Sequence, residues 1–170
     1  DVLNVNKAPR ILFNAVVVDT INVSTLENKP IELCVETEDE DGDLISLSDL
    51  TLLSGDGTNE IVENAGQYCL THSPALNFSG DTYLGLTVCD NGNPQLCAYV
   101  VIHIEVINVN NPPEIIQDNA VQDTIRFSTP ARTTLTANVE AIDKDDGDQL
   151  SLILPATSLA GGQVVSGLDR

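Results

Sequence analysis

The sequence contains no Met and no Trp, and aromatic residues make up only 4% of its 170 positions. Hydrophobic residues still account for 42% of the chain, so any packed core must consist mainly of Val, Ile and Leu. β-Branched side chains fit a pleated surface and are stiff in helices, so the composition favours strands. The length suits one domain or two small ones.

Basic residues are scarce, with 7 Lys and Arg against 26 Asp and Glu, which gives a formal net charge of −19. Nucleic acid and anionic membrane surfaces attract positive charge, so we expect neither as a partner. Bound divalent cations would relieve the mutual repulsion of the acids, and a solvated acidic surface is the alternative explanation.

Long apolar runs are missing too: none approaches the roughly 20 residues of a membrane span, so we expect no membrane insertion in this segment. There is no initiator Met and no signal-like start, which predicts a segment of a longer or processed protein. No G-x-S-x-G motif, phosphate loop or dinucleotide fingerprint is present. The only histidines, His72 and His103, lie in no nucleophile or metal-ligand motif. We therefore expect no enzymatic activity.

An internal repeat organises the chain. Residues 4–11 (NVNKAPRI) reappear 104 positions later as residues 108–115 (NVNNPPEI). Further matches at this offset follow without gaps as far as the first acidic turn. They are Asp19-Thr20-Ile21 with Asp123-Thr124-Ile125, Ser24-Thr25 with Ser128-Thr129, Val35-Glu36 with Val139-Glu140, and Asp39 and Asp41 with Asp143 and Asp145. A fixed period is the signature of a repeat array.

Each repeat of about 100 residues has the size of an immunoglobulin-like sandwich. In the first repeat we predict strands at residues 16–23, 31–37, 44–47, 67–71, 82–89 and 97–107. Alternating apolar residues support the last two, and residues 90–94 (DNGNP) favour a hairpin between them. The predicted organisation is all-β: the end of a preceding strand at 1–8, a sandwich at 9–107, a linker at 108–113, and a partial second sandwich at 114–170.

The four cysteines, at positions 34, 69, 89 and 97, contain no CxxC pair, which argues against zinc. Strand parity places Cys34 and Cys69 on outward faces, and Cys89 and Cys97 flank one hairpin. Opposed residues on antiparallel strands come close enough for a disulfide. We therefore predict Cys34–Cys69 and Cys89–Cys97 disulfides and an oxidising, extracellular compartment, with free thiols as the alternative.

Three features recur in a fixed order. Residues 25–30 (TLENKP) precede the second strand, residues 38–43 (EDEDGD) follow it, and residues 108–113 (NVNNPP) form the linker. With residues 88–94 (VCDNGNP), this order resembles the cadherin repeat and the cadherin-like tandem repeats of bacterial surface proteins. The resemblance covers the first repeat and the first half of the second.

Calcium takes six to eight hard oxygen ligands, which carboxylates and the carbonyls of an Asn-rich linker can supply. The resemblance implies two sites. At the junction between repeats it assigns the ligands Glu27, Asn108, Asn110, Asn111, Asp143 and Asp145. At the other end of the first repeat it assigns Asn4, Asn6, Asp39, Asp41 and Asp90. Asp43 and Asp148 belong to the same turns, either as ligands or as turn-closing residues.

The sequence departs from the cadherin pattern at several positions. Ala131 stands where the first repeat has Glu27, Asn108 stands where cadherins usually carry Asp, and the linker is one residue shorter. The acidic pair before the sixth strand is missing, with Asp81 the nearest candidate. We therefore expect one or two ions at the junction rather than three.

The most consistent function is an extracellular, calcium-stiffened structural or adhesive module of a cell-surface protein. Its expected partners are other copies or repeats, cell-surface proteins or glycans. Two alternatives stay open: a fibre subunit assembled by strand addition, and a carbohydrate-binding or accessory domain of a secreted enzyme, which an exposed aromatic platform would favour. Asn22 and Asn77 fit the N-glycosylation pattern, and Thr20 and Thr124 fit an O-glycosylation triplet.

Overall fold

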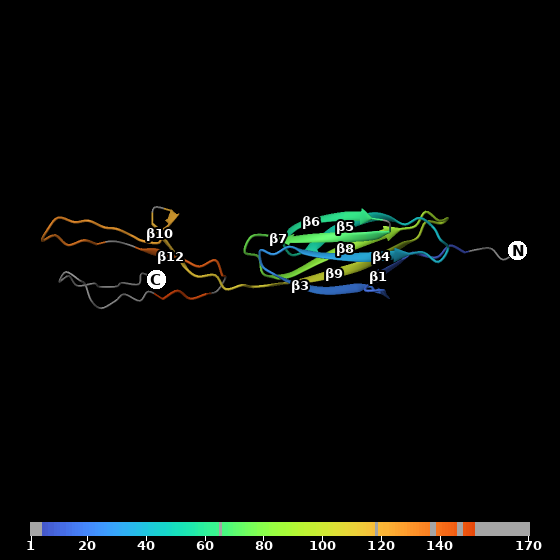
Figure 1. Ribbon diagram of the computed structural model, residues 1–170, viewed down its shortest axis with the longest axis horizontal. Helices are drawn as coiled ribbons and strands as arrows, with labels where there is room; N and C mark the ends of the chain where they lie inside the picture. Colours follow the sequence, from blue (N-terminus) through green and yellow to red (C-terminus); the bar gives the residue numbers. More distant parts are fainter. Residues whose placement is uncertain (1–4, 65, 118, 137–138, 146–147, 152–170) are drawn as a thin grey trace. The chain divides into compact units, whose positions relative to one another are not determined.

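The computed structural model forms two compact units, Asp1–Val109 and Asn110–Arg170 (Figure 1). It describes residues 5–64, 66–117, 119–136, 139–145 and 148–151. Within those residues the secondary structure consists of strands and turns. None of it provides a helix able to cross a membrane.

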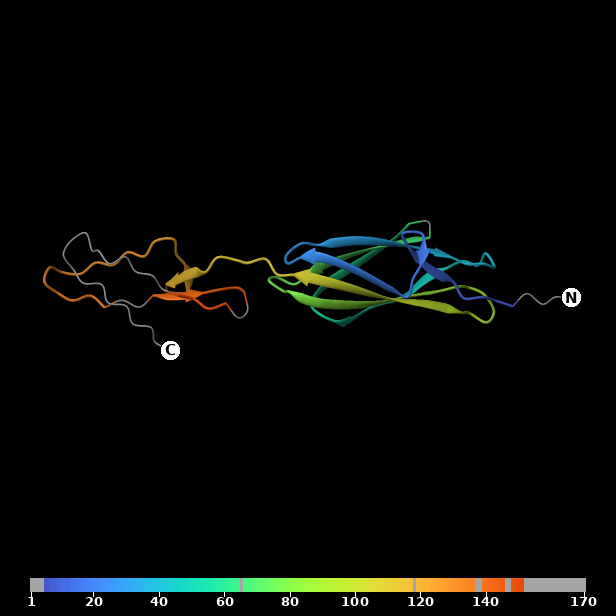
Figure 2. The same ribbon diagram turned by 90° about the horizontal axis from the view of Figure 1, so that it is seen from below.

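The first unit is a sandwich of two sheets, whose layers are visible in Figures 1 and 2. One sheet has the order β2-β1-β4-β7-β6, and the other has the order β3-β9-β8-β5. Neighbouring strands are antiparallel except β3 and β9, which run parallel. The strands are β1 (Arg10–Phe13), β2 (Val16–Val17), β3 (Thr20–Leu26), β4 (Ile31–Glu38), β5 (Ser46–Ser54), β6 (Gly57–Asn64), β7 (Gln67–Pro74), β8 (Gly80–Cys89) and β9 (Cys97–Ile107).

The core lies between the two sheets and is almost entirely aliphatic, as the composition predicts. Inward-pointing residues alternate along β8 and β9, and Leu84, Leu86 and Val88 of β8 are each at most 1% exposed. The remaining buried hydrophobic members of the cluster are Ile11, Ile21, Leu33, Val35, Tyr68, Leu70, Val100, Ile102, Ile104 and Val106.

Two strand predictions need correction, and two strands were missed. The strand expected at residues 16–23 is two strands in different sheets, because the chain crosses between the layers around Val18. The strand expected at 44–47 runs instead over β5, where register shifts between Leu47 and Asp49 and between Leu52 and Ser54 break the alternation. Strands β1 and β6 were not predicted. β6 is a mostly polar edge strand, so its sequence lacks an apolar stripe.

The second unit reproduces the start of the first with the same register. Its three strands are β10 (Glu114–Gln117), β11 (Ala120–Val121) and β12 (Glu140–Ile142), in the order β11-β10-β12. β1 pairs Arg10 with Glu38, and β10 pairs Glu114 with Ile142, 104 positions later in both strands. The turn that follows each of these first strands has positive φ, at Ala15 and at Asn119. The sequence repeat is therefore also a structural repeat.

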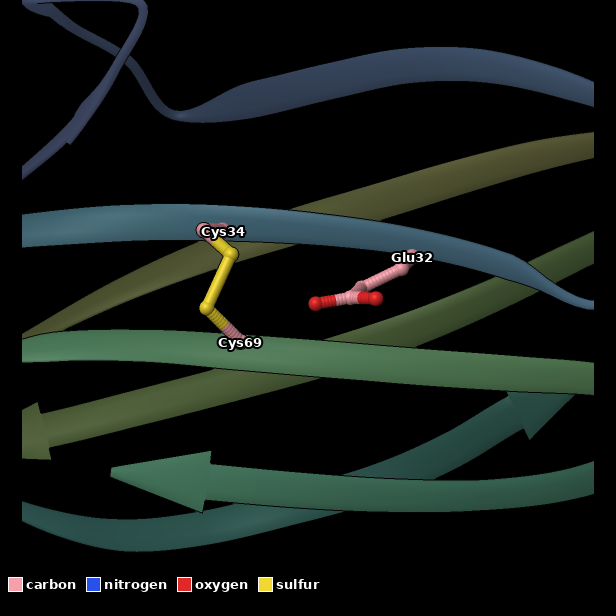
Figure 3. Close-up of side chains that lie close together, drawn as sticks. All are labelled: Glu32, Cys34 and Cys69. Carbon is pink, nitrogen blue, oxygen red and sulfur yellow. A yellow bond between two sulfur atoms is a disulfide. The ribbon is translucent and has the colours of Figure 1, made fainter. Parts of the chain in front are cut away.

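Both predicted disulfides are present: Cys34–Cys69 and Cys89–Cys97, with S–S distances of 2.07 and 2.06 Å. Each joins directly opposed residues of an antiparallel pair, β4 with β7 and β8 with β9. Cys34–Cys69 lies on the outer face of its sheet beside the Glu32 carboxylate (Figure 3). Because the two sulfurs are bonded to each other, this group offers no thiolate ligands and is not a metal site.

Candidate calcium sites

At the N-terminal end of the first unit, an Asn and four Asp side chains gather around a small cavity. We call Asn6, Asp39, Asp41, Asp43 and Asp90 the first-repeat cluster. The Asp residues come from two loops, one after β4 and one between β8 and β9, which end at the same side of the sandwich. The cavity has a volume of about 210 Å³ and is lined by Asn6, Asp41, Asp43, Gly92 and Asn93.

Asp90 holds this end of the sandwich together. It is 1% exposed, and its Oδ1 accepts hydrogen bonds from the backbone N–H groups of Gly92 (3.1 Å) and Leu96 (2.9 Å). These hydrogen bonds, that of Leu96 above all, lower the pKa of the Asp90 carboxyl. Its Oδ2 accepts from Asn6 Nδ2 at 2.9 Å. Asp90 is therefore ionised and fixes both the loop and Asn6.

The Asn6 carboxamide is held in one orientation by two hydrogen bonds. Its Nδ2 donates to Asp90 and to the Pro94 carbonyl, both at 2.9 Å, which uses both of its protons. The Oδ1 atom is thereby left as the hard ligand that the residue offers to the cavity it lines. A Cβ at Gly92 would lie 2.4 Å from the Asn6 carboxamide, so this close approach requires glycine.

The turn after β4 shapes the rest of the cluster. Asp39 Oδ1 accepts the backbone N–H of Asp41 at 2.8 Å, and Asp41 Oδ2 accepts that of Lys7 at 2.7 Å. Asp39 Oδ2 is buried and has no hydrogen-bond partner. A buried carboxylate oxygen without a partner is costly, and a bound cation would satisfy it. This set of hard oxygens fits calcium.

The positive charges near the first-repeat cluster pair with glutamates rather than with the aspartates of the cluster. The basic side chains at this end pair with glutamates: Lys7 with Glu40 at 2.6 Å, and Arg10 with Glu38 and Glu40 at 3.3 and 2.9 Å. The four aspartates form no ion pair within the described chain. Burial, followed by repulsion from the neighbouring aspartates, raises the pKa of Asp43. Such crowding favours a cation.

The second unit carries a matching acidic group. We call Asn111, Asp143, Asp145 and Asp148 the second-repeat cluster. One carboxylate oxygen from each aspartate lies within 4.8 Å of the others. Asp145 is buried, and its two oxygens accept from the Asn111 backbone N–H at 2.5 Å and from Asn111 Nδ2 at 3.3 Å. These three aspartates form an acidic cluster of the kind that holds a cation.

The hydrogen bonds of the two clusters repeat at the same offset of 104 residues. The bond from the Asp41 N–H to Asp39 corresponds to that from the Asp145 N–H to Asp143, at 2.8 and 3.0 Å. The bond from the Lys7 N–H to Asp41 corresponds to that from the Asn111 N–H to Asp145. In both repeats, an Asp-x-Asp turn therefore binds the main chain that leads into the first strand, β1 or β10.

A nearby ion pair recurs with its charges exchanged. Arg10 binds Glu40 at 2.9 Å in the first repeat, and Glu114 binds Lys144 at 2.5 Å at the equivalent positions of the second. In each repeat the ion pair therefore joins the first strand, β1 or β10, to the acidic turn. The positive partner is on the strand in the first repeat and on the turn in the second. The aspartates keep their sign in both repeats, which separates them from ordinary surface charge.

The other predicted ligands are placed as follows. Glu27 is buried at the end of β3, and its N–H donates to the Ile107 carbonyl at 2.9 Å, next to Asn108. Asn108 and Asn110 are exposed, and Asn110 Nδ2 lies 3.4 Å from the Asn111 carbonyl. Asn4 lies outside the described residues. Asp43 and Asp148 also close their turns, with N–H groups that bind Asp39 Oδ1 and the Asp145 carbonyl.

Apart from Asp90, the contributions of the β8–β9 loop and of the main chain were not predicted. Asn91 Oδ1 accepts the Leu44 N–H at 2.8 Å, and Gln95 Nε2 donates to the Asp90 carbonyl at 2.7 Å. For Asn91 the sequence signal was the DNGNP hairpin pattern, which predicted a turn and no partner for this side chain. The Lys7 N–H has no sequence signal, because any residue except proline offers it.

The predicted glycosylation residues occupy varied settings. Asn22 lies exposed on β3, and its Oδ1 is 3.1 Å from His103 Nδ1. Asn77 exchanges hydrogen bonds with Asn28, accepting one at its Oδ1 and donating one from its N–H. Thr20 and Thr124 are exposed. Glycosylation of these residues stays a prediction.

No protein-family model matches the sequence, and no curated protein matches it. Among solved structures, human CDH23 EC21-23 superposes with a TM-score of 0.53 at 21% identity, covering 86% of this chain and 49% of that one. Protocadherin Gamma C5 EC1-3 gives a TM-score of 0.46 at 20% identity, covering 85% of this chain and 48% of that one.

A nucleoside hydrolase-related hypothetical protein from Saccharophagus degradans gives a TM-score of 0.48 at 23% identity, covering 59% of this chain and 26% of that one. The chain thus spans about half of the cadherin fragments and about a quarter of the Saccharophagus protein. The similarity to CDH23 is distant, and it shows the fold: the chain is an all-β protein that resembles tandem cadherin domains.

Proposed function

We propose that this chain is an extracellular structural or adhesive module whose repeats bind calcium at their Asp-x-Asp turns. The observation that carries the proposal is the recurrence of one hydrogen-bonded arrangement in both repeats. It joins Asp39 and Asp41 to Lys7, and Asp143 and Asp145 to Asn111. Two disulfides and a cadherin-like fold support the extracellular assignment.

In this proposal calcium acts as a stiffener rather than as a catalyst. The second-repeat cluster includes Asn111 of the linker, so an ion bound to both Asn111 and Asp145 would hold this end of the linker on the second unit. Glu27 and Asn108 as further ligands from the first repeat stay a prediction. A chain of repeats stiffened in this way would project from a surface and bind other copies or cell-surface proteins.

Calcium should raise the stability of the chain. Extracellular modules bind calcium weakly, so about a tenfold excess over the dissociation constant should add roughly 1.4 kcal/mol to the free energy of unfolding. Calorimetric unfolding in calcium and in EDTA measures this difference. An unchanged midpoint in both conditions would contradict the proposal.

Single substitutions should distinguish calcium binding by the first-repeat cluster from calcium binding by the second-repeat cluster. Asp145→Asn should remove calcium binding by the second repeat, and Asp41→Asn should remove it from the first, as measured by isothermal titration calorimetry. Glu114→Gln is the matched control: it removes one negative charge from the same unit, but Glu114 pairs with Lys144 outside the cluster. If Glu114→Gln lowers calcium binding as much as Asp145→Asn, the effect is general charge and the assigned ligands are wrong.

A further inference from the structure

The outer face of the β3-β9-β8-β5 sheet gathers two of the three tyrosines. Tyr68 is in the core, whereas Tyr83 on β8 and Tyr99 on β9 point outward. The register places Tyr83 directly opposite His103, and Gly85 lies between Tyr83 and the position opposite Tyr99. Three rings thus share one small area of a protein in which aromatic residues make up only 4%.

The Oη–Cε2 edge of the Tyr99 ring lies against Gly85. A Cβ at Gly85 would lie 2.7 Å from the Tyr99 Oη and 2.9 Å from its Cε2, so only glycine leaves room for this ring. Tyr99 nevertheless remains 51% exposed. Half of the Tyr99 surface is therefore open to a ligand.

Tyr83 and His103 form the neighbouring part of this face. Their rings stack with centroids 4.6 Å apart and an interplanar angle of 11°. The imidazole is fixed at both nitrogens, by Asp81 Oδ1 at 2.7 Å and by Asn22 Oδ1 at 3.1 Å. Rigid aromatic side chains give up little conformational entropy when a ligand binds.

Hydroxyl and carboxylate groups surround the rings. The strands of this sheet contain no Lys or Arg, and their outward positions carry Thr51, Thr87, Asp49, Asp81 and Glu105. The outer face of the other sheet differs: it carries Glu32, Glu36 and Glu60 around the Cys34–Cys69 disulfide and has no outward aromatic ring. Aromatic rings and hydroxyls are thus concentrated on one side of the sandwich.

We propose that this face, centred on Tyr99 and the Tyr83–His103 stack, binds a neutral glycan. A pyranose ring has a face of C–H groups, which the negative face of an aromatic ring attracts, and a rim of hydroxyls, which carboxylates and hydroxyls bind. The acids on this face and the net charge of −19 repel sulfated and uronic-acid glycans. Charge therefore selects a neutral sugar over an anionic one.

Affinity electrophoresis tests this assignment. Native gels containing a soluble neutral polysaccharide (mixed-linkage β-glucan, xyloglucan, galactomannan or dextran) should retard the full chain in at least one case. Tyr99→Ala should weaken that binding about tenfold. Tyr99→Phe, which keeps the ring, should retain most of it. Gly85→Ala should weaken binding as well, because it lifts the Tyr99 ring from the sheet without removing it.

The outer face of the other sheet provides the control. Val62→Ala changes an exposed residue on the outer face of the other sheet and should leave retardation unchanged. No retardation by any of the four polysaccharides overturns the proposal, as does retardation that Tyr99→Ala leaves intact. Self-association of the chain that Tyr99→Ala abolishes, seen by sedimentation, would assign the face to a second copy instead.

Glycan binding is separable from the calcium sites. The aromatic face belongs to the middle of β8 and β9, whereas the first-repeat cluster lies in loops at the end of the sandwich. Retardation should therefore persist in EDTA and in Asp145→Asn. Failure of either proposal leaves the other standing.

Discussion

Replacing Cys34 and Cys69 together by serine is expected to lower the free energy of unfolding of the first unit by about 4 kcal/mol. The disulfide closes a sequence separation of 35 residues between β4 and β7, and the unfolded chain gains the corresponding freedom when it is removed. Urea unfolding followed by circular dichroism measures the loss as a lower midpoint with a similar slope.

The second disulfide is the matched comparison. Cys89–Cys97 closes only 8 residues across one hairpin, so its removal should cost less, about 2.5 kcal/mol. An equal or larger loss for the short loop would show that loop-closure entropy is not the dominant contribution. Midpoints that do not change when both disulfides are removed would contradict the role of either bond in stability.

Lowering the pH from 7 to 5 is expected to destabilise the first unit through His72. This imidazole is fully buried; its Nδ1 lies 2.8 Å from Asn59 Oδ1, and its Nε2 has no partner. Protonation would place an unpaired N–H and a charge in the core, so burial lowers the His72 pKa below its ordinary value of 6.5. The strand partners of His72, Ile31 and Asn59, carry no charge to offset this.

The direction in which stability changes with pH follows from the proton that His72 takes up on unfolding. The unfolded chain protonates His72 near pH 6.5, whereas the folded chain resists protonation until a lower pH, so unfolding takes up a proton as the pH falls. Stability is full above pH 6.5 and declines below it; the loss at pH 5 is at most about 2 kcal/mol, the free energy of protonating a free imidazole at that pH. Urea midpoints at pH 7 and pH 5, measured in EDTA, give the loss.

Two variants test whether His72 causes the loss of stability towards pH 5. His72→Gln should be less stable at pH 7 but should show a smaller decline towards pH 5, because glutamine does not titrate. His103→Gln removes the other histidine, which lies on the outer face of the sheet, and the decline should persist. A decline that His72→Gln leaves unchanged would exclude His72 as its source.

The repeat, the fold class and the disulfides were predictable because they depend on short-range patterns. Alternating Leu84, Leu86 and Val88 specify which face of β8 is buried, and the same alternation places Cys34 and Cys69 on outward faces. The 104-residue offset by itself aligns Asp39 and Asp41 with Asp143 and Asp145. A period of two along a strand is a local property, and so is an exact repeat of sequence.

Two kinds of feature could not be predicted. Strand β6 has few apolar residues, and the register shifts in β5 break its alternation, so their positions depend on the strands beside them. The same holds for functional surfaces. Alternation along β9 puts Tyr99 and His103 on one face, but nothing local indicates that Tyr83 stacks on His103 or that Tyr99 lies against Gly85.

The sequence by itself determined an all-β tandem repeat, an aliphatic core, two disulfides and the acidic residues suited to calcium. The tertiary structure alone decided which of these acids use their oxygens to hold the loops and which keep an oxygen without a hydrogen-bond donor. Asp90 uses both oxygens on N–H donors, whereas Asp39 keeps one buried oxygen without a partner. The reason is physical: an aspartate's role depends on which donors the fold brings within about 3 Å of it, and these donors are distant in the chain.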